Sequence, residues 1–378
     1  MKLTQILIEA LTQVKTDESL AAMSNLYFTG PISSDEMVAG LSMMPYLKSP
    51  TLQTISILTH LIRNSALDKS KLMLIASSTI HSFCRNNFDC RQNEAIQLLM
   101  KWIEVPLGGS CSANSVQRQD EIIIALKAIG NAGFISNIEI LKACFESSDN
   151  AVKIRLAAID ALRRMDCNMV RSSKVLHIYS ELKENPEVRI AAYLASMRCP
   201  SDFLFTLVKN TLLVENTNQV GSFVWTHLEN LNNKHSPYQH LIRSIIAKSQ
   251  LKNKFNTDAR RFSRNYAGTT YFDSINVGSA IDANVVFSPE SYLPRSLGLN
   301  LTVDVFGESV NLFDFGARLE GFESIVEGFF DADGYYPDKN IRSMLENLKV
   351  QSSSEENEIS ELSDTFMSSR TLLKSPKV

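Results

Sequence analysis

Hydrophobic residues recur at helical spacing along the first 255 residues of the chain. In one segment near residue 50, Leu52, Ile55, Leu58, Leu61 and Ile62 form a single stripe. Their spacing of three or four residues is that of one face of an α-helix. Segments of this kind follow one another and are joined by short polar turns. The pattern therefore predicts helices that stack as antiparallel neighbours over residues 1–255.

Two of these segments read as nearly the same helix. KIRLAAIDALRRM begins at Lys153 and VRIAAYLASMR begins at Val188. When Arg155 is aligned with Arg189, 34 residues later, both segments place an Ala-Ala pair at the same position. A repeat of this length is typical of helical solenoids. We therefore expect a degenerate, HEAT-like superhelix in which the small Ala-Ala pairs let neighbouring helices approach closely.

Glycine and loop composition predict where some helices end. In EIIIALKAIGNAG, Gly130 and Gly133 are natural helix stops, because glycine readily adopts the left-handed conformation that ends many helices. The stretch GGSCSANSVQ, residues 108–117, is a loop by composition.

After residue 262 the hydrophobic period changes to two residues, the pattern of a β-strand with one apolar face. SLGLNLTVDVFG places Leu297, Leu299, Leu301, Val303 and Val305 on one side, and LFDFGARLEG places Phe313, Phe315, Ala317 and Leu319 on one side. Turn signals such as SPESYLPRS separate such stretches. We predict an α+β fold: the helical solenoid, antiparallel strands over residues 262–337, then a short helix and a Ser/Glu-rich disordered tail over residues 338–378.

The apolar face of the predicted sheet must be covered by something. Burying one Leu or Val side chain is worth about 1.5–3 kcal/mol, so a five-residue stripe does not remain in water. The face packs either against protein, as in a sandwich or against the helices, or against lipid. Periodicity alone does not choose between these two interpretations.

Composition narrows the function classes. The chain has 378 residues and a net charge of −3. Its basic pairs, Arg163-Arg164 and Arg260-Arg261, are too sparse for a nucleic-acid footprint and are expected on a solvated helix face. No stretch approaches the roughly 20 apolar residues of a membrane span. The opening MKLTQILIEALTQVK reads as an amphipathic helix rather than a secretory signal.

The sequence offers little for catalysis or metal binding. It contains no nucleophile elbow, phosphate-binding loop or zinc-protease motif. His227, His235 and His240 are the nearest approach to a metal cluster, and surface or helix-end positions are the favoured interpretation for them. We therefore expect neither an enzyme, a metal site nor a cofactor. The six cysteines form no C-x-x-C pair and are either free thiols or disulfides.

The region after residue 220 carries a family resemblance. VGSFVWTHLENLNN, RRFSRNY, FSPESYLPRSLGLNLTVDVFG and GFFDADGYYPD follow in an order that resembles the large lipid transfer proteins. This family contains vitellogenin, apolipoprotein B, insect apolipophorin and the microsomal triglyceride transfer protein. The last two stretches most resemble the apolipoprotein B and apolipophorin branch. The resemblance covers about residues 1 to 345.

The resemblance implies a horseshoe of paired helices that braces an amphipathic sheet lining a lipid cavity. The lipid-facing residues would then be Leu297, Leu299, Leu301, Val303, Val305, Phe313, Phe315 and Leu319. Phospholipid and neutral lipid would be bound in a longer parent protein, since the family's signal peptide, β-barrel and later β-sheets are not in this sequence. The expected partners are lipids, the remaining domains of that parent and a cell-surface lipoprotein receptor.

The resemblance also implies secretion through the endoplasmic reticulum. Two of the family's disulfides match Cys84 with Cys90 and Cys167 with Cys199, which leaves two cysteines, Cys111 and Cys144, either free or paired together. In a secreted protein, the sequon at Asn300 would be a glycosylation site. The alternative function is a helical-repeat scaffold that binds protein partners on its concave face.

Overall fold

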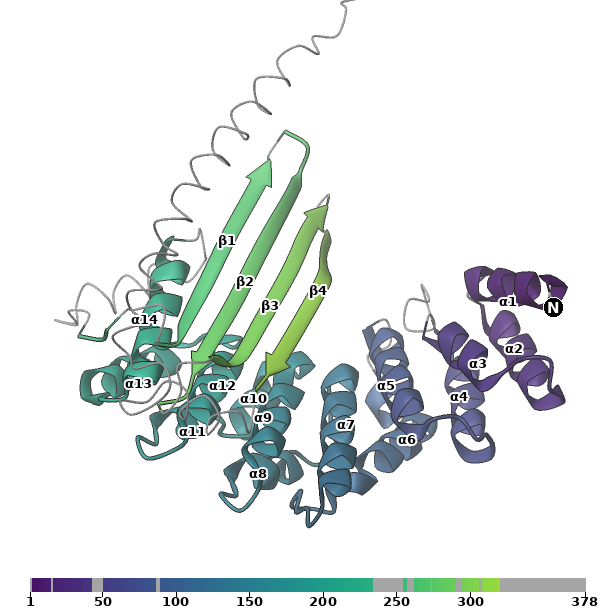
Figure 1. The fold of residues 1–378 in the computed structure, drawn as a ribbon, viewed down its shortest axis with the longest axis horizontal. Helices are drawn as coiled ribbons and strands as arrows, with labels where there is room; N and C mark the ends of the chain where they lie inside the picture. Colours follow the sequence, from purple (N-terminus) through teal and green to yellow (C-terminus); the bar gives the residue numbers. More distant parts are fainter. Residues whose placement is uncertain are drawn as a thin grey trace, which may run out of the picture. The chain divides into compact units, whose positions relative to one another are not determined.

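The computed structural model describes residues 2–14, 16–42, 50–85, 89–233, 254–256, 262–272, 274–289, 294–305 and 308–319. The chain divides into two compact units. The first comprises Met1–Thr257 and Phe262–Thr269, and the second comprises Asp258–Arg261 and Thr270–Val378. The first unit is helical, and the second holds most of the sheet (Figure 1).

The helices of the first unit are α1 (Lys2–Val14), α2 (Asp17–Thr29), α3 (Ser34–Leu41), α4 (Leu52–Asn64), α5 (Lys69–Arg85), α6 (Glu94–Glu104), α7 (Val116–Ala132), α8 (Ile138–Glu146), α9 (Val152–Asp160), α10 (Cys167–Ser172), α11 (Leu176–Ser180), α12 (Pro186–Met197), α13 (Asp202–Val214) and α14 (Asn218–Asn233). Short 3-10 turns are η2 (Cys90–Gln92), η3 (Val105–Leu107) and η4 (Ala161–Arg164). Several helices begin at a hydroxyl that accepts a hydrogen bond from a first-turn N–H: Ser33, Thr51, Ser115 and Ser201.

The helices pack in the pattern of a helix-pair solenoid. Along one row, α5 packs on α7, α7 on α9, α9 on α12 and α12 on α14. Along a second row, α4 packs on α6 and α11 on α13. The two similar segments found in the sequence lie in α9 and α12. The second alanine of each Ala-Ala pair, Ala158 and Ala192, is fully buried. The prediction of a helical superhelix followed by antiparallel strands is confirmed.

The two arginines aligned by the sequence repeat, Arg155 and Arg189, are buried, and they join neighbouring elements of the solenoid. Each guanidinium donates to a carbonyl ten residues upstream and pairs with a glutamate further along the chain. Arg155 donates to Phe145 O at 2.8 Å and to Glu184 at 2.9 Å. Arg189 donates to Tyr179 O at 2.9 Å and to Glu215 at 3.2 Å. Arg189 and Glu215 have almost no exposed side-chain surface. The sequence repeat therefore preserves an ionic connection as well as the alanine contact.

One of the two predicted helix stops is wrong. Gly133 does end α7, in the left-handed conformation with φ 79°. Gly130 lies inside the helix, where a Cβ atom would overlap the guanidinium of Arg163. That guanidinium donates to Lys127 O at 2.8 Å and to Asn131 Oδ1 at 2.6 Å. The Arg163 guanidinium therefore occupies the space that the missing side chain of Gly130 leaves beside α7. The expectation that Arg163 lies simply on a solvated helix face is wrong.

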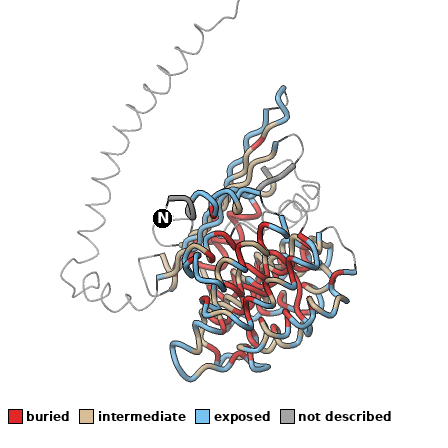
Figure 2. Tube along the Cα trace, turned by 90° about the vertical axis from the view of Figure 1, so that its right-hand side faces the viewer, coloured by how far each residue is buried: buried red, intermediate tan, exposed pale blue. Residues whose placement is uncertain are grey.

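The described strands are β1 (Arg264–Phe272), β2 (Val277–Phe287), β3 (Pro294–Val305) and β4 (Glu308–Arg318). They form one sheet in the order β1-β2-β3-β4, and β3 pairs antiparallel with both β2 and β4. Buried residues concentrate in the helices, whereas the strands are mostly exposed or half-buried (Figure 2). The remainder of the predicted strand region, residues 320–337, and the predicted tail, residues 338–378, lie outside the described residues.

Candidate functional site

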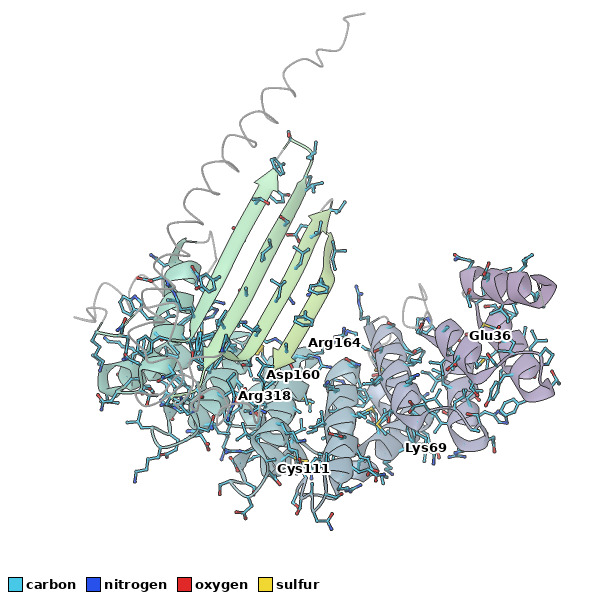
Figure 3. The ribbon with its side chains drawn as sticks, viewed as in Figure 1. Glu36, Lys69, Cys111, Asp160, Arg164 and Arg318 are labelled. Carbon is cyan, nitrogen blue, oxygen red and sulfur yellow. A yellow bond between two sulfur atoms is a disulfide. The ribbon has the colours of Figure 1, made fainter. Side chains whose placement is uncertain are left out.

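Antiparallel register gathers apolar residues of three strands on one face of the sheet. Residues directly opposite each other in such a pair share a face. We call the following set the apolar sheet face: Leu297, Leu299 and Leu301 of β3, opposite Val285, Ala283 and Ile281 of β2 and opposite Ala317, Phe315 and Phe313 of β4. Figure 3 draws the side chains of the described strands as sticks along the sheet.

The large side chains of the apolar sheet face are substantially exposed. The exposed fraction is 48% for Ile281, 39% for both Leu297 and Leu299, 47% for Phe313 and 49% for Phe315. The two phenylalanine rings stack with centroids 6.1 Å apart. Contiguous exposed apolar surface of this kind is unusual on a soluble monomer. It is typical of surfaces that contact a protein partner, a membrane or a ligand.

The opposite face of the same sheet is polar. Asn300 lies in register between Asp282 and Asp314, and Gly298 lies between Asn284 and Gly316. Thr302 Oγ1 donates to Asn300 Oδ1 at 3.1 Å, so both polar residues of the sequon lie on this face. The sheet is thus amphipathic across its width, with carboxylates and amides behind the apolar residues.

The remaining predicted lipid-facing residues belong to the same sheet. Val303 and Val305 continue the alternation of β3 opposite Ser279 and Val277. The pairing with β4 shifts between Leu301 and Thr302 in β3, where Leu312 has no opposite residue in the register. Leu319 follows β4, is exposed, and its N–H donates to Arg295 O at 2.9 Å.

The alternation of DANVVF, residues 282–287, predicts a further strand, but the sequence prediction did not include the β2 residues among the lipid-facing ones. Ile281, Ala283 and Val285 alternate with Asp282 and Asn284, a signal that the sequence already contains. Their register opposite β3 is what adds them to the face, and this depends on the turn between the two strands.

All six cysteines are paired in the structure. Disulfides join Cys84 to Cys90, Cys167 to Cys199 and Cys111 to Cys144. The first two are the pairs that the family resemblance implied. The third resolves the alternative left open for the remaining two cysteines.

The candidate histidines do not come together as a described cluster. The surface or helix-end position favoured for His227 is wrong: this residue lies inside α14 and is buried, and its Nδ1 lies 2.8 Å from the Tyr193 hydroxyl. Burial raises the pKa of Tyr193 well above its usual range, so this hydroxyl stays neutral. His235 and His240 lie outside the described residues.

Among the residues that the structure describes, no group of three His, Cys, Asp or Glu side chains could hold a metal ion. Within the same residues, no helix is long and apolar enough to cross a bilayer.

Family models match both units. Residues 2–229 match the vitellogenin TPR domain, and residues 261–376 match the vitellinogen open beta-sheet. The chain belongs to the vitellogenin and apolipophorin family of large lipid transfer proteins. The family resemblance predicted from the sequence is thereby confirmed, in the order of domains expected.

Several relatives resemble more than half of the chain, and some resemble almost all of it. Apolipophorins of Locusta migratoria are 29% identical over 98% of this chain and 11% of the relative. Vitellogenin of Penaeus merguiensis is 25% identical over 92% of this chain and 14% of the relative. Apolipoprotein B-100 of Rattus norvegicus is 32% identical over 58% of this chain and 5% of the relative. The chain therefore spans about a tenth of the length of the apolipophorins that it matches.

A solved structure shares the fold. The structure, which concerns lipid-protein interactions in lipovitellin, superposes with a TM-score of 0.74 at 22% identity. The match covers 87% of this chain and 35% of that chain. The combination of a helical superhelix and an open sheet is therefore common to both.

Proposed function

We propose that this chain is a non-enzymatic lipid-binding part of a lipid carrier, in which the apolar sheet face contacts acyl chains. The observation that carries the proposal is the exposure of large apolar side chains in register across three strands. The names of the relatives, apolipophorins and vitellogenins, support the same function.

The chemistry of the face favours bulk lipid over one specific ligand. Its nine residues carry no charge and no side-chain hydrogen-bonding group, so nothing on the face selects one polar ligand. Acyl chains need no such group, because burial of apolar area alone stabilises the contact. Phospholipid and neutral lipid both present acyl chains, and we propose both as ligands of the assembled parent protein.

The proposed lipid-facing residues are those of β3, Leu297, Leu299, Leu301, Val303 and Val305, together with Phe313, Phe315 and Leu319 from the β4 region. Secretion through the endoplasmic reticulum belongs to the same proposal, and three disulfides are typical of such a compartment. A glycan on Asn300 would stand on the polar face, away from lipid. Uptake by a cell-surface receptor rests on the family likeness alone.

The test compares two single substitutions at neighbouring positions of β3. Leu301→Asp places a carboxylate on the apolar sheet face between Ile281 and Phe313, and Asn300→Asp places the same group on the polar face one residue away. Both variants are made without glycosylation and mixed with phosphatidylcholine–triolein emulsions, and bound protein is measured by flotation. We expect Leu301→Asp to lower lipid binding about tenfold or more, since a charge is poorly accommodated among acyl chains.

Asn300→Asp should bind emulsion as the parent chain does. Circular dichroism of both variants checks that the helical signal is kept. Equal binding by Leu301→Asp and the unchanged chain would overturn the assignment of this face to lipid.

A further inference from the structure

A second apolar site is formed by residues of the helical unit alone. It is a pocket of about 360 Å³ formed by α10, α11 and the turn between them, together with the end of α12 and the start of α13. The disulfide from Cys167 to Cys199 crosses this region, and Cys199 itself lines the pocket. A covalent bond therefore holds two of the pocket's walls together.

The interior of the pocket is apolar. Val170, Val175 and Leu204 line it and are buried, and Leu176 is half-buried. Phe203 also lines it and is 65% exposed, which is unusual for a phenylalanine on a folded helix. A ligand that covered this ring would remove apolar surface from water, which stabilises binding.

Apart from Phe203, the exposed lining residues of the pocket are basic. Arg171, Lys174 and His177 recur every three residues in RSSKVLH, and all three are exposed. Among the described residues they form no ion pair. Asp202, in the first turn of α13, is not one of the lining residues. The mouth of the pocket is therefore cationic while its walls are apolar.

This combination fits one class of ligand. An apolar interior takes a hydrocarbon chain, and a cationic mouth pairs with a negatively charged head. The volume lies near the lower end of the roughly 300–1,000 Å³ found for small-molecule pockets, so it suits one chain rather than two.

We propose that this pocket binds a single-chain anionic amphiphile, with its acyl chain against Phe203 and Leu204 and its carboxylate or phosphate at Arg171 and Lys174. Fatty acids and acidic lysophospholipids share this chemistry. The site would hold one molecule in defined orientation, in contrast to the bulk lipid proposed for the sheet. Neither site requires the other.

The test is titration of the purified 378-residue chain with oleate, followed by calorimetry and by NMR of the labelled carboxyl carbon. Three variants are compared: Arg171→Glu/Lys174→Glu reverses the charge at the mouth, Phe203→Ala removes an exposed wall, and Lys71→Glu changes an exposed lysine of α5 as a charge control. We expect the double variant to weaken oleate binding about tenfold or more and to shift the carboxyl resonance, as charge-assisted hydrogen bonds are lost. Phe203→Ala should also weaken it, and Lys71→Glu should not.

Other outcomes separate the possible ligands and sites. Lysophosphatidic acid should bind as oleate does, and lysophosphatidylcholine, whose head has no net charge, should bind more weakly. Inorganic phosphate binding as tightly as oleate would overturn the role of the acyl chain.

If Leu301→Asp abolished oleate binding while the pocket variants kept it, oleate would occupy the sheet: the pocket proposal would fail and the lipid-binding proposal would stand. Loss of oleate binding in the pocket variants alone would support the pocket proposal, and the sheet would still be tested by emulsion flotation.

Discussion

The helical unit and the sheet treat large side chains in opposite ways. In the helices even a charged residue is buried: Arg189 is fully enclosed, as is Phe145 in α8. In the sheet, phenylalanines of β4 and leucines of β3 are close to half exposed, although β3 pairs with a neighbouring strand on both sides. The difference is one of packing partners and not of composition.

This contrast indicates where the stability of each unit comes from. The helices satisfy their own apolar and polar groups, repeat upon repeat, so their stability is internal. In the described sheet, β3 is paired along both sides, but the large side chains of the apolar sheet face remain substantially exposed. Substitutions should therefore affect folding in the first unit and binding in the second.

A matched pair of phenylalanines tests this division most directly. Phe145→Ala should lower the free energy of unfolding by about 3–5 kcal/mol, since it leaves a cavity in a closed core. Phe315→Ala should lower it by less than about 1 kcal/mol in lipid-free protein, since half of the ring is already exposed. Urea unfolding followed by circular dichroism measures both. Equal losses would show that the sheet face is packed against protein.

The buried ion pair gives a comparable effect by a different route. Arg189→Met leaves the Glu215 carboxylate buried without its cation and should cost about 3–5 kcal/mol. Replacing both residues by methionine should recover much of the loss, because no buried charge is left unpaired. As a control, Glu139→Gln breaks an exposed pair with Lys142 and should cost less than about 1 kcal/mol. Unfolding in urea again provides the measurement.

The sequence allowed the general fold to be predicted because hydrophobic period is a local property. The change from helical spacing to alternation located the sheet, and the parity of Leu297 to Val305 assigned its apolar side. The role of Gly130 was missed because the Arg163 guanidinium that fills its place comes from a neighbouring repeat. The buried pairs were missed for the same reason: Glu184 lies 29 residues after Arg155.

The pocket in the helical unit was beyond sequence reasoning for a related reason. Its basic residues are visible in RSSKVLH, but its walls come from helices that only the superhelix brings together. The β-bulge at Leu312 is similar, since a register shift cannot be read from one strand alone.

The disulfides of the helical unit should differ in their effect. Replacing Cys167 and Cys199 by serine opens a connection of 32 residues and should cost about 2–4 kcal/mol. Replacing Cys84 and Cys90 opens one of only 6 residues, and should cost about 1.5 kcal/mol less, since loop entropy grows with the logarithm of loop length. Thermal unfolding of the two double variants ranks them. The reverse order would mean that native-state packing, and not the unfolded chain, dominates the effect.

The smallest expected effect concerns a helix cap and its pH dependence. Asp166 caps α10 by accepting from Asn168 N at 3.1 Å and Met169 N at 3.0 Å, and it pairs with Arg91 at 3.1 Å. The hydrogen bond from the Met169 backbone, more than the nearby Arg91 guanidinium, holds the pKa of Asp166 below its usual 3.8, against the opposing effect of burial.

Because its pKa is lower in the folded state, Asp166 stabilises the protein above its unfolded pKa, and that contribution is lost as the pH falls from about 5 towards 2. Asp166→Ala should therefore cost about 1 kcal/mol at neutral pH. Asp166→Asn keeps an acceptor for the cap but cannot titrate, so its difference from the unchanged chain should shrink on acidification. Urea midpoints at neutral and acid pH measure this. A difference independent of pH would mean that the carboxylate charge contributes nothing and that the cap acts through hydrogen-bond geometry alone.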